Sequence, residues 1–232
     1  MSKMLIMGNG PSLKNVRFND LKVDTFGMNN AYKYYDEMNW YPTYWGCFDK
    51  AMTYNSNNAV LHLDFFRKGK CKEYYTLNGN AKGIDKVNFI DLKIWNRRGA
   101  IRKHSKSEPF LNVGHTAANC VQVSILKGYT EIILIGIDGD FKIFDGVVKE
   151  RSGQLRLTKE MKDNPNYGWD SYQEKNEVFN PENKERLIMP TWKHLSGWAG
   201  DNGIKVINCS ENSIVRDLFE YKSLEDAGVY NG

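Results

Sequence analysis

The segment Gly8-Asn9-Gly10-Pro11-Ser12 follows an apolar run and joins several features that suit the binding of an anion. Its two glycines leave backbone N–H groups uncovered by side chains. Pro11 followed by Ser12 is typical of the first turn of a helix, and a helix N-terminus attracts negative charge. The segment matches neither the pattern G-x-G-x-x-G nor the pattern G-x-x-x-x-G-K-S/T. Two interpretations therefore stand: a phosphate or nucleotide site, and a strand-to-turn corner that binds nothing.

A second candidate anion site lies at Gly114, His115 and Thr116, directly before apolar residues at helical spacing. His115 is the first candidate for a base that accepts the proton of a hydroxyl group, because a helix N-terminus favours the neutral imidazole. His194, close to Trp192 in a second expected helix, is the other candidate. For both histidines the alternative is a capping or packed polar group.

Other polar residues follow apolar runs. Asn29 and Asn30 offer neutral hydrogen-bonding groups for a ribose or a base, and Asp49 ends a third run. Asp138 and Asp140 lie one residue apart, so they can share a magnesium or manganese ion that bridges a diphosphate. The alternative is that Asp138 only ends a strand and caps the next turn.

A parallel sheet is needed to bring these residues together. Apolar runs ending near residues 7, 28, 48 and 137 alternate with helix-compatible segments, which predicts an α/β, Rossmann-like fold with a mostly parallel central sheet and helices on both faces. In such sheets ligands bind beyond the carboxyl ends of the strands. Further expected elements are strands at 59–66, 86–95 and 204–210, helices at 116–127 and 184–199, and a helix or irregular cover at 213–227.

The chain of 232 residues is expected to form a single nucleotide-binding domain over 1–232 with an irregular, lid-like insertion at 139–182. The insertion is polar and aromatic, and a segment of this length in a compact domain is often functional. Its aromatic residues can stack on a sugar or base, or can cover the sheet edge. The candidate substrate residues are Asn166, Tyr167, Trp169 and Tyr172.

Composition sets limits on location and partners. The four cysteines form no C-x-x-C pair and lie in or beside apolar segments, which favours reduced, buried thiols and a cytoplasmic protein. We expect neither a signal peptide nor a transmembrane segment. The net charge of +4 is mild and the cations are scattered, so nucleic acid is not an expected partner. A homo-oligomer is compatible with the sequence.

Several motifs occur in a characteristic order: GNGPSL at 8–13, F-x-M-N-N-A-Y at 26–32, P-T-Y-W-G-C-F-D at 42–49, and G-Y-T-E-I-I-L-I-G-I-D at 128–138. With the Gly-His-Thr helix start, this order resembles the bacterial family-42 sialyltransferases and the related motility-accessory-factor domain, which is itself similar to the archaeal hydroxymethylpterin pyrophosphokinases. The resemblance covers 5–50 and 110–141 well, and the closing V-I-N-C-S-E-N-S moderately. Between 51 and 109 there is none.

The resemblance implies a sheet that binds a nucleotide, which in the sialyltransferases is cytidine monophosphate carrying a nonulosonic acid. It places a donor-holding turn at Asn112, Gly114 and Thr116, and it places Arg186 near the position of the family's base histidine. The remaining residues that would contact the phosphate, ribose or donor are Gly8, Asn9, Gly10, Pro11, Ser12, Asn29 and Asn30.

The expected activity is therefore that of a glycosyltransferase, which moves a sugar from a nucleotide-activated donor to a hydroxyl group of a glycan or small-molecule acceptor. Sialic acid or another nonulosonic acid is the sugar that the resemblance implies. Two alternatives stay open: ATP-dependent pyrophosphoryl transfer to a small heterocyclic alcohol, and a non-catalytic module that binds a nucleotide or glycan. No cofactor is firmly expected apart from the divalent metal considered at Asp138 and Asp140.

Overall fold

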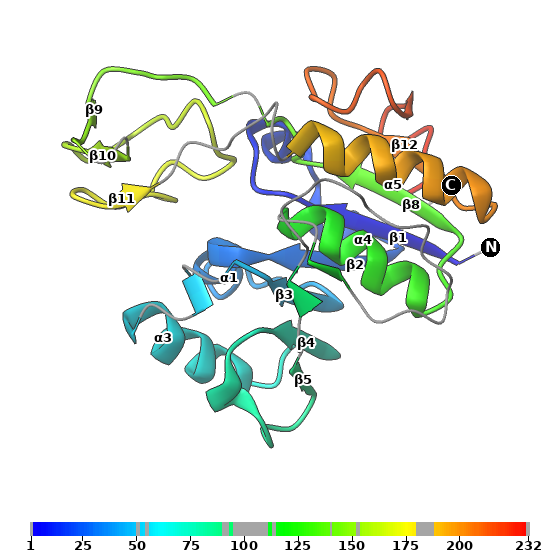
Figure 1. The fold of residues 1–232 in the computed structure, drawn as a ribbon, viewed down its shortest axis with the longest axis horizontal. Coiled ribbons are helices and arrows are strands. Elements are labelled where there is room, and N and C mark those ends of the chain that lie inside the picture. Colours follow the sequence, from blue (N-terminus) through cyan, green and yellow to red (C-terminus); the bar gives the residue numbers. More distant parts are fainter. Residues whose placement is uncertain are drawn as a thin grey trace.

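The computed structural model describes residues 2–49, 52–53, 56–89, 93–94, 111–112, 115–139, 141–151, 154–179 and 188–230. Its centre is an eight-stranded sheet in the order β13-β12-β8-β1-β2-β3-β4-β5, and every neighbouring pair in it is parallel. The strands are β1 (Lys3–Met7), β2 (Asp24–Met28), β3 (Tyr44–Cys47), β4 (Glu73–Thr76), β5 (Val87–Phe89), β8 (Glu131–Ile135), β12 (Lys205–Asn208) and β13 (Glu220–Tyr221). The predicted α/β fold with a parallel sheet is confirmed (Figure 1).

The helices lie on both faces of the sheet. The α-helices are α1 (Tyr32–Tyr35), α3 (Ser56–Arg67), α4 (Thr116–Leu126) and α5 (Met189–Asp201). Short 3-10 helices are η1 (Pro11–Asn15), η2 (Phe18–Asp20), η3 (Asn29–Ala31) and η4 (Gly79–Ala81). Two further strands, β6 (Lys93–Ile94) and β7 (Leu111–Asn112), pair with each other outside the central sheet.

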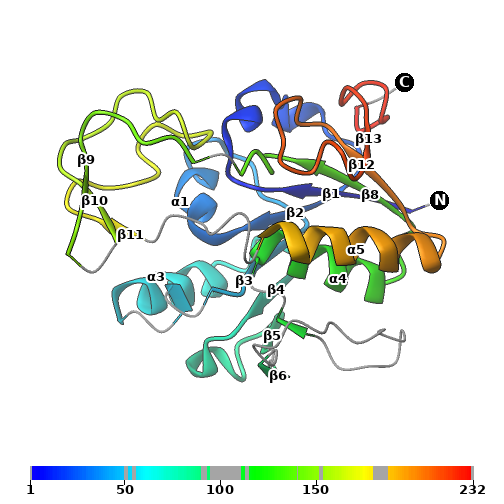
Figure 2. The same ribbon diagram turned by 45° about the horizontal axis from the view of Figure 1, so that its top comes forward.

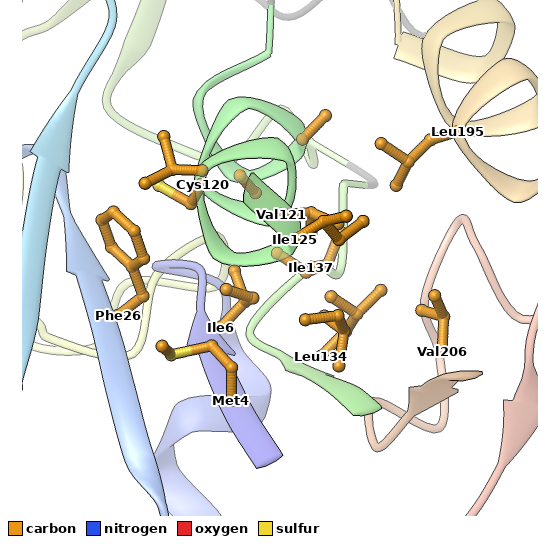
Figure 3. Close-up of a cluster of buried hydrophobic side chains, with 14 of the residues drawn as sticks. Met4, Ile6, Phe26, Cys120, Val121, Ile125, Leu134, Ile137, Leu195 and Val206 are labelled. Carbon is orange, nitrogen blue, oxygen red and sulfur yellow. The ribbon is translucent and has the colours of Figure 1, made fainter. Parts of the chain in front are cut away.

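Alternating side chains of β1 divide the core into two layers. Met4 and Ile6 point to the face covered by α4 and α5, where they pack with residues such as Leu134 (Figure 3). Leu5 and Met7 point to the opposite face, which is covered by η1 and the C-terminal segment. Strands that are buried on both faces need the near-continuous apolar runs seen in this sequence.

A second sheet forms the middle of the insertion. It consists of β9 (Val147–Lys149), β10 (Leu155–Leu157) and β11 (Val178–Phe179), paired antiparallel in the order β11-β10-β9. This sheet stands apart from the central sheet in both views (Figures 1 and 2). The expectation of an irregular insertion is therefore wrong for these three strands, whose short runs give little alternation to detect.

The expectation of a strand at 59–66 is wrong, because these residues lie within α3. His62, Phe65 and Phe66 are buried while Val60 and Leu61 are exposed, which is the three-to-four-residue spacing of a helix. The strand β4 was not predicted. Of the C-terminal segment 213–227, only Glu220–Tyr221 forms a strand and the rest is turns.

All four cysteines are buried and free, as expected. Within the described part of the chain, no helix is long and apolar enough to span a bilayer.

Candidate functional site

The carboxyl ends of β1 and β8 meet at one edge of the sheet. There the Gly8 N–H donates to the Ile135 carbonyl at 2.8 Å, and the Gly10 N–H donates to the Gly136 carbonyl at 2.9 Å. The Ser12 N–H donates to Oδ2 of Asp138 at 3.2 Å. The expectation of bare amide groups is therefore wrong at Gly8, Gly10 and Ser12, because the neighbouring strand end uses all three donors.

The glycines at this corner are required by backbone packing. A Cβ atom on Gly8 would lie 2.2 Å from the Gly136 carbonyl oxygen, and one on Gly10 would lie 2.0 Å from Oδ2 of Asp138. Gly136 has a φ of +73°, which disfavours any side chain there. The Gly-Asn-Gly pattern thus has a structural cause that needs no phosphate.

We expect Gly8→Ala to destabilise the fold by about 2 to 4 kcal/mol, because its methyl group meets backbone atoms that cannot rotate away. The midpoint of urea denaturation measures the loss. Gly197→Ala is the matched control, since a Cβ atom at this position in α5 has no neighbour within 4 Å. Equal stability of the two variants would contradict the close approach of β1 and β8.

Ser12 and Asp138 form a hydrogen-bonded network beneath the corner. The Ser12 hydroxyl donates to Oδ2 of Asp138 at 2.8 Å and accepts the Gly136 N–H at 2.9 Å, and it lies 2.8 Å from Oγ of Ser210. Burial raises the pKa of Asp138, and the two hydrogen bonds from Ser12 oppose this rise. The network fastens the ends of β1, β8 and β12 together.

The metal hypothesis stays a prediction. Asp140 lies outside the described residues, and the Asp138 carboxylate accepts a hydrogen bond from the Ser12 hydroxyl. Among the residues that the structure describes, no group of three or more His, Cys, Asp or Glu is placed to hold a metal ion.

Three asparagines gather at the ends of β1 and β2. The side chain of Asn9 follows β1, while Asn29 and Asn30 follow β2 in η3. The side-chain carbonyl oxygen of each is buried and has no hydrogen-bond partner in the described structure. Buried polar atoms are normally paired, so three unpaired acceptors at the ends of neighbouring strands mark this edge of the sheet as a place for hydrogen-bond donors.

The insertion covers this asparagine cluster, by which we mean Asn9, Asn29 and Asn30. The Asn9 side-chain amide donates to the Tyr172 hydroxyl at 2.8 Å and to the Met28 carbonyl at 3.4 Å. The Gly168 N–H donates to the Asn9 carbonyl at 2.9 Å. The backbone N–H of Asn30 lies near the Tyr172 hydroxyl and partly offsets the rise in the pKa of that group. Tyr172 is thus the residue of the insertion that lies against both strand ends.

Aromatic stacking and ion pairs hold the insertion on the sheet edge. The Trp169 ring stacks on Tyr34 with centroids 4.9 Å apart and an interplanar angle of 2°, and Tyr167 stacks on Tyr172 at 4.2 Å. Lys33 pairs with Glu174 at 2.8 Å. Lys33 and Tyr34 were missed in the sequence, although Y-K-Y-Y directly after the asparagines is an aromatic signal.

The side chain of Asn166 forms hydrogen bonds within the insertion. It bonds both the N–H and the carbonyl of Lys142, at 2.7 and 2.8 Å. It is 9% exposed, so its side chain stabilises the insertion rather than presenting a free amide.

The two candidate bases lie at helices on one face of the sheet. His115 is the N-cap of α4, and its ring packs edge-to-face against Trp192 with centroids 5.6 Å apart. Thr116 is the first residue of α4, and His194 lies within α5. Because α4 leads directly into β8, its N-terminus lies at the carboxyl edge of the sheet (Figure 2). A catalytic role for either histidine stays a prediction.

The remaining candidate site residues lie in different parts of the chain, and only some of them are at the carboxyl edge of the central sheet. Asp49 follows β3, and its carbonyl accepts the N–H of Thr53 at 2.9 Å. Asn112 belongs to β7, outside the central sheet. Gly114 lies outside the described residues, so the second candidate anion site is described only from His115 onward.

His62 packs against Tyr32, and on the sequence alone it has a weaker claim to be a base than His115 or His194. It is fully buried among Tyr32, Trp45 and Phe66, and neither ring nitrogen has a hydrogen-bond partner among the described residues. Burial lowers the pKa of His62 to about 4, with a smaller effect from the charge of Lys33. At neutral pH the ring is therefore uncharged.

Comparison with known proteins supports the fold. No protein-family model matches the sequence, and no curated protein matches it. A crystal structure of an α-2,3-sialyltransferase from Campylobacter jejuni in its apo form is similar, with 16% identity, a TM-score of 0.50, and coverage of 100% of this chain and 83% of that one. A variant of the sialyltransferase CST-II in complex with CMP is similar at 15% identity and a TM-score of 0.50, covering 94% of this chain and 85% of that one.

Proposed function

We propose that this chain is a glycosyltransferase that takes a sugar from a nucleotide-activated donor and transfers it to a hydroxyl acceptor. The donor binds at the carboxyl edge of the sheet, where the asparagine cluster and Tyr172 meet. One observation carries the proposal: three buried side-chain carbonyl oxygens without partners lie at adjacent strand ends, under an aromatic cover. The likeness in fold to sialyltransferases favours sugar transfer over pyrophosphoryl transfer.

The asparagine cluster suits a neutral, hydroxyl- or amine-bearing part of the donor. Its unpaired acceptors need N–H or O–H donors, which a ribose or an amino-substituted base supplies. An asparagine keeps the same charge across the physiological pH range, so this recognition does not depend on pH. The cluster therefore binds the nucleoside part of the donor rather than its phosphate.

Tyr172 provides the group that stabilises the leaving phosphate. Its hydroxyl oxygen accepts an N–H group of Asn9 at 2.8 Å, which leaves the hydroxyl proton for a ligand. Burial raises the pKa of Tyr172 well above its usual range, so the proton stays in place at neutral pH. A hydroxyl donor held in this way can bond the phosphate oxygen on which charge develops as the sugar leaves.

The sugar is proposed to be a nonulosonic acid and the nucleotide CMP, in line with the sequence resemblance. Isothermal titration with CMP, CDP, UDP, GDP and ATP tests the binding, followed by mass spectrometry of mixtures with the matching nucleotide sugars and glycan acceptors. Saturable binding of CMP and release of CMP from CMP-sugar are expected. Binding without turnover favours a non-catalytic module, and binding of none of these nucleotides removes the proposal.

Asn9→Ala is expected to weaken nucleotide binding by about 1 to 3 kcal/mol, the cost of leaving a buried hydrogen-bonding group without its partner. Calorimetry with CMP measures the change in Kd. Asn15→Ala is the matched control, because this asparagine is exposed at the end of η1. If both variants bind CMP as the unmodified protein does, the nucleotide does not contact Asn9.

A further inference from the structure

The small sheet of the insertion exposes apolar side chains. Val148, Arg156 and Val178 lie directly opposite one another in the register of β9, β10 and β11, so they share one face. Val148 is 44% exposed and Val178 47%, while Leu155 and Leu157 on the other face are buried. Ile143, just before β9, is 77% exposed. The apolar surface thus lies on the side turned away from the protein core.

Exposed cations adjoin Ile143 and Val148 along the chain. Lys142, Lys149 and Arg151 are exposed, and none of them pairs with a carboxylate in the described part of the chain. We call the exposed residues Lys142, Ile143, Val148, Lys149, Arg151 and Val178 the basic tip. Asn166 fixes the backbone of Lys142 through two hydrogen bonds, so Ile143 is held in place on the surface.

Most described carboxylates of the insertion are paired with cations other than those of the basic tip. Asp163 and Asp170 pair with Lys14, at 3.0 and 3.5 Å, and Glu174 pairs with Lys33 at 2.8 Å, all on the side that faces the central sheet. Glu150 neutralises Arg156, and Asp145 pairs with Lys159. Three carboxylates of the insertion are thus held on the side of the central sheet and two more are neutralised within the insertion, while Lys142, Lys149 and Arg151 keep their charges unpaired among the described residues.

We propose that the basic tip docks the protein on an anionic lipid bilayer. Cations attract an acidic membrane surface, and exposed Ile and Val side chains can enter its interfacial region. A second copy of the chain fits less well, because two positive tips would repel each other. Both views show the tip at an end of the molecule, clear of the central sheet, where it can meet a flat surface (Figures 1 and 2). This inference goes beyond the proposed function and does not rest on it.

Flotation with lipid vesicles tests the docking. We expect the protein to bind vesicles of phosphatidylcholine with about one third phosphatidylglycerol, to bind pure phosphatidylcholine at least about tenfold more weakly, and to lose binding as salt rises. Absence of binding to the acidic vesicles at low salt would overturn the proposal.

Paired variants distinguish an effect of the basic tip from an effect of the protein's net charge. Lys142→Glu with Lys149→Glu, and separately Ile143→Asp, are each expected to reduce vesicle binding about tenfold or more. Lys22→Glu with Lys193→Glu changes the net charge equally at other exposed positions, and Leu126→Asp alters another exposed apolar residue, 49% exposed, at the far end of α4. Both controls should bind as the unmodified protein does.

Two results would contradict the assignment of the tip. One is equal vesicle binding by tip variants and controls. The other is a concentration-dependent dimer, seen by analytical ultracentrifugation, that the tip variants abolish while vesicle binding persists. Circular dichroism and CMP calorimetry of each variant monitor the fold and the sheet-edge site independently, so failure of nucleotide binding leaves the vesicle result interpretable.

Discussion

Tyr172→Phe is expected to lower kcat about a hundred- to a thousandfold while changing the Kd for CMP by less than about fivefold, the pattern for loss of one donor that acts on the developing charge. The substitution keeps the ring and its stacking on Tyr167. It removes the hydroxyl group that accepts a hydrogen bond from Asn9. Release of CMP from a CMP-sugar under saturating donor measures kcat.

Tyr34→Phe is the matched control for this experiment. Tyr34 also stacks on the insertion, but its hydroxyl lies 3.2 Å from Ser171 on the exposed side. We expect an unchanged kcat in this variant. A Tyr172→Phe protein that turns over as fast as the Tyr34→Phe protein would show that the Tyr172 hydroxyl has no part in catalysis.

The free energy of unfolding of the unmodified protein is expected to fall by about 3 kcal/mol on acidification because of His62. His62→Phe is expected to remove this loss. The pKa of His62 is lowered from 6.5 to about 4 in the fold by burial. Between these values the unfolded chain binds the proton and the folded chain does not, so protonation favours unfolding. The contribution of neutral His62 is complete above pH 6.5 and is lost as the pH falls toward 4.

Urea denaturation of both proteins at several pH values between 4 and 7.5 measures this difference, since contributions from the carboxyl groups cancel when the two curves are subtracted. Phenylalanine fits the aromatic surroundings of Tyr32, Trp45 and Phe66 and removes two unpaired nitrogen atoms. The variant should be at least as stable as the unmodified protein at pH 7.5. Parallel stability curves would mean that the pKa of His62 is not lowered in the fold.

The sequence was sufficient for the elements whose patterns are local. Apolar runs placed β1, β2, β3 and β8 and brought Asn9, Asn29 and Asn30 to one edge. It was insufficient where a short apolar segment is compatible with both the two-residue period of a strand and the 3.6-residue period of a helix. Residues 59–66 contain enough apolar side chains to resemble a strand, and only the burial of His62, Phe65 and Phe66 identifies a helix.

The chemistry of the edge was harder to predict, because it depends on contacts between distant segments. Gly8 and Gly10 suggested free amides, yet their N–H groups bond the end of β8. The pairing of Asn9 with Tyr172 joins residues that no local pattern connects. The sequence therefore predicted where the candidate site lies, at the carboxyl edge of the sheet. It did not predict that side chains, rather than backbone amides, provide the free hydrogen-bonding groups there.

The position of β1 between β2 and β8 affects how the chain can fold during synthesis. Lys3 lies opposite Glu131 in the parallel register, so one side of β1 has no partner until β8 has been synthesised. An apolar strand with a free edge invites pairing with other chains, and such long-range pairing slows folding. The pairing of β1 with β8 is therefore a late, long-range step of folding, whereas its pairing with β2 joins segments that are close along the chain.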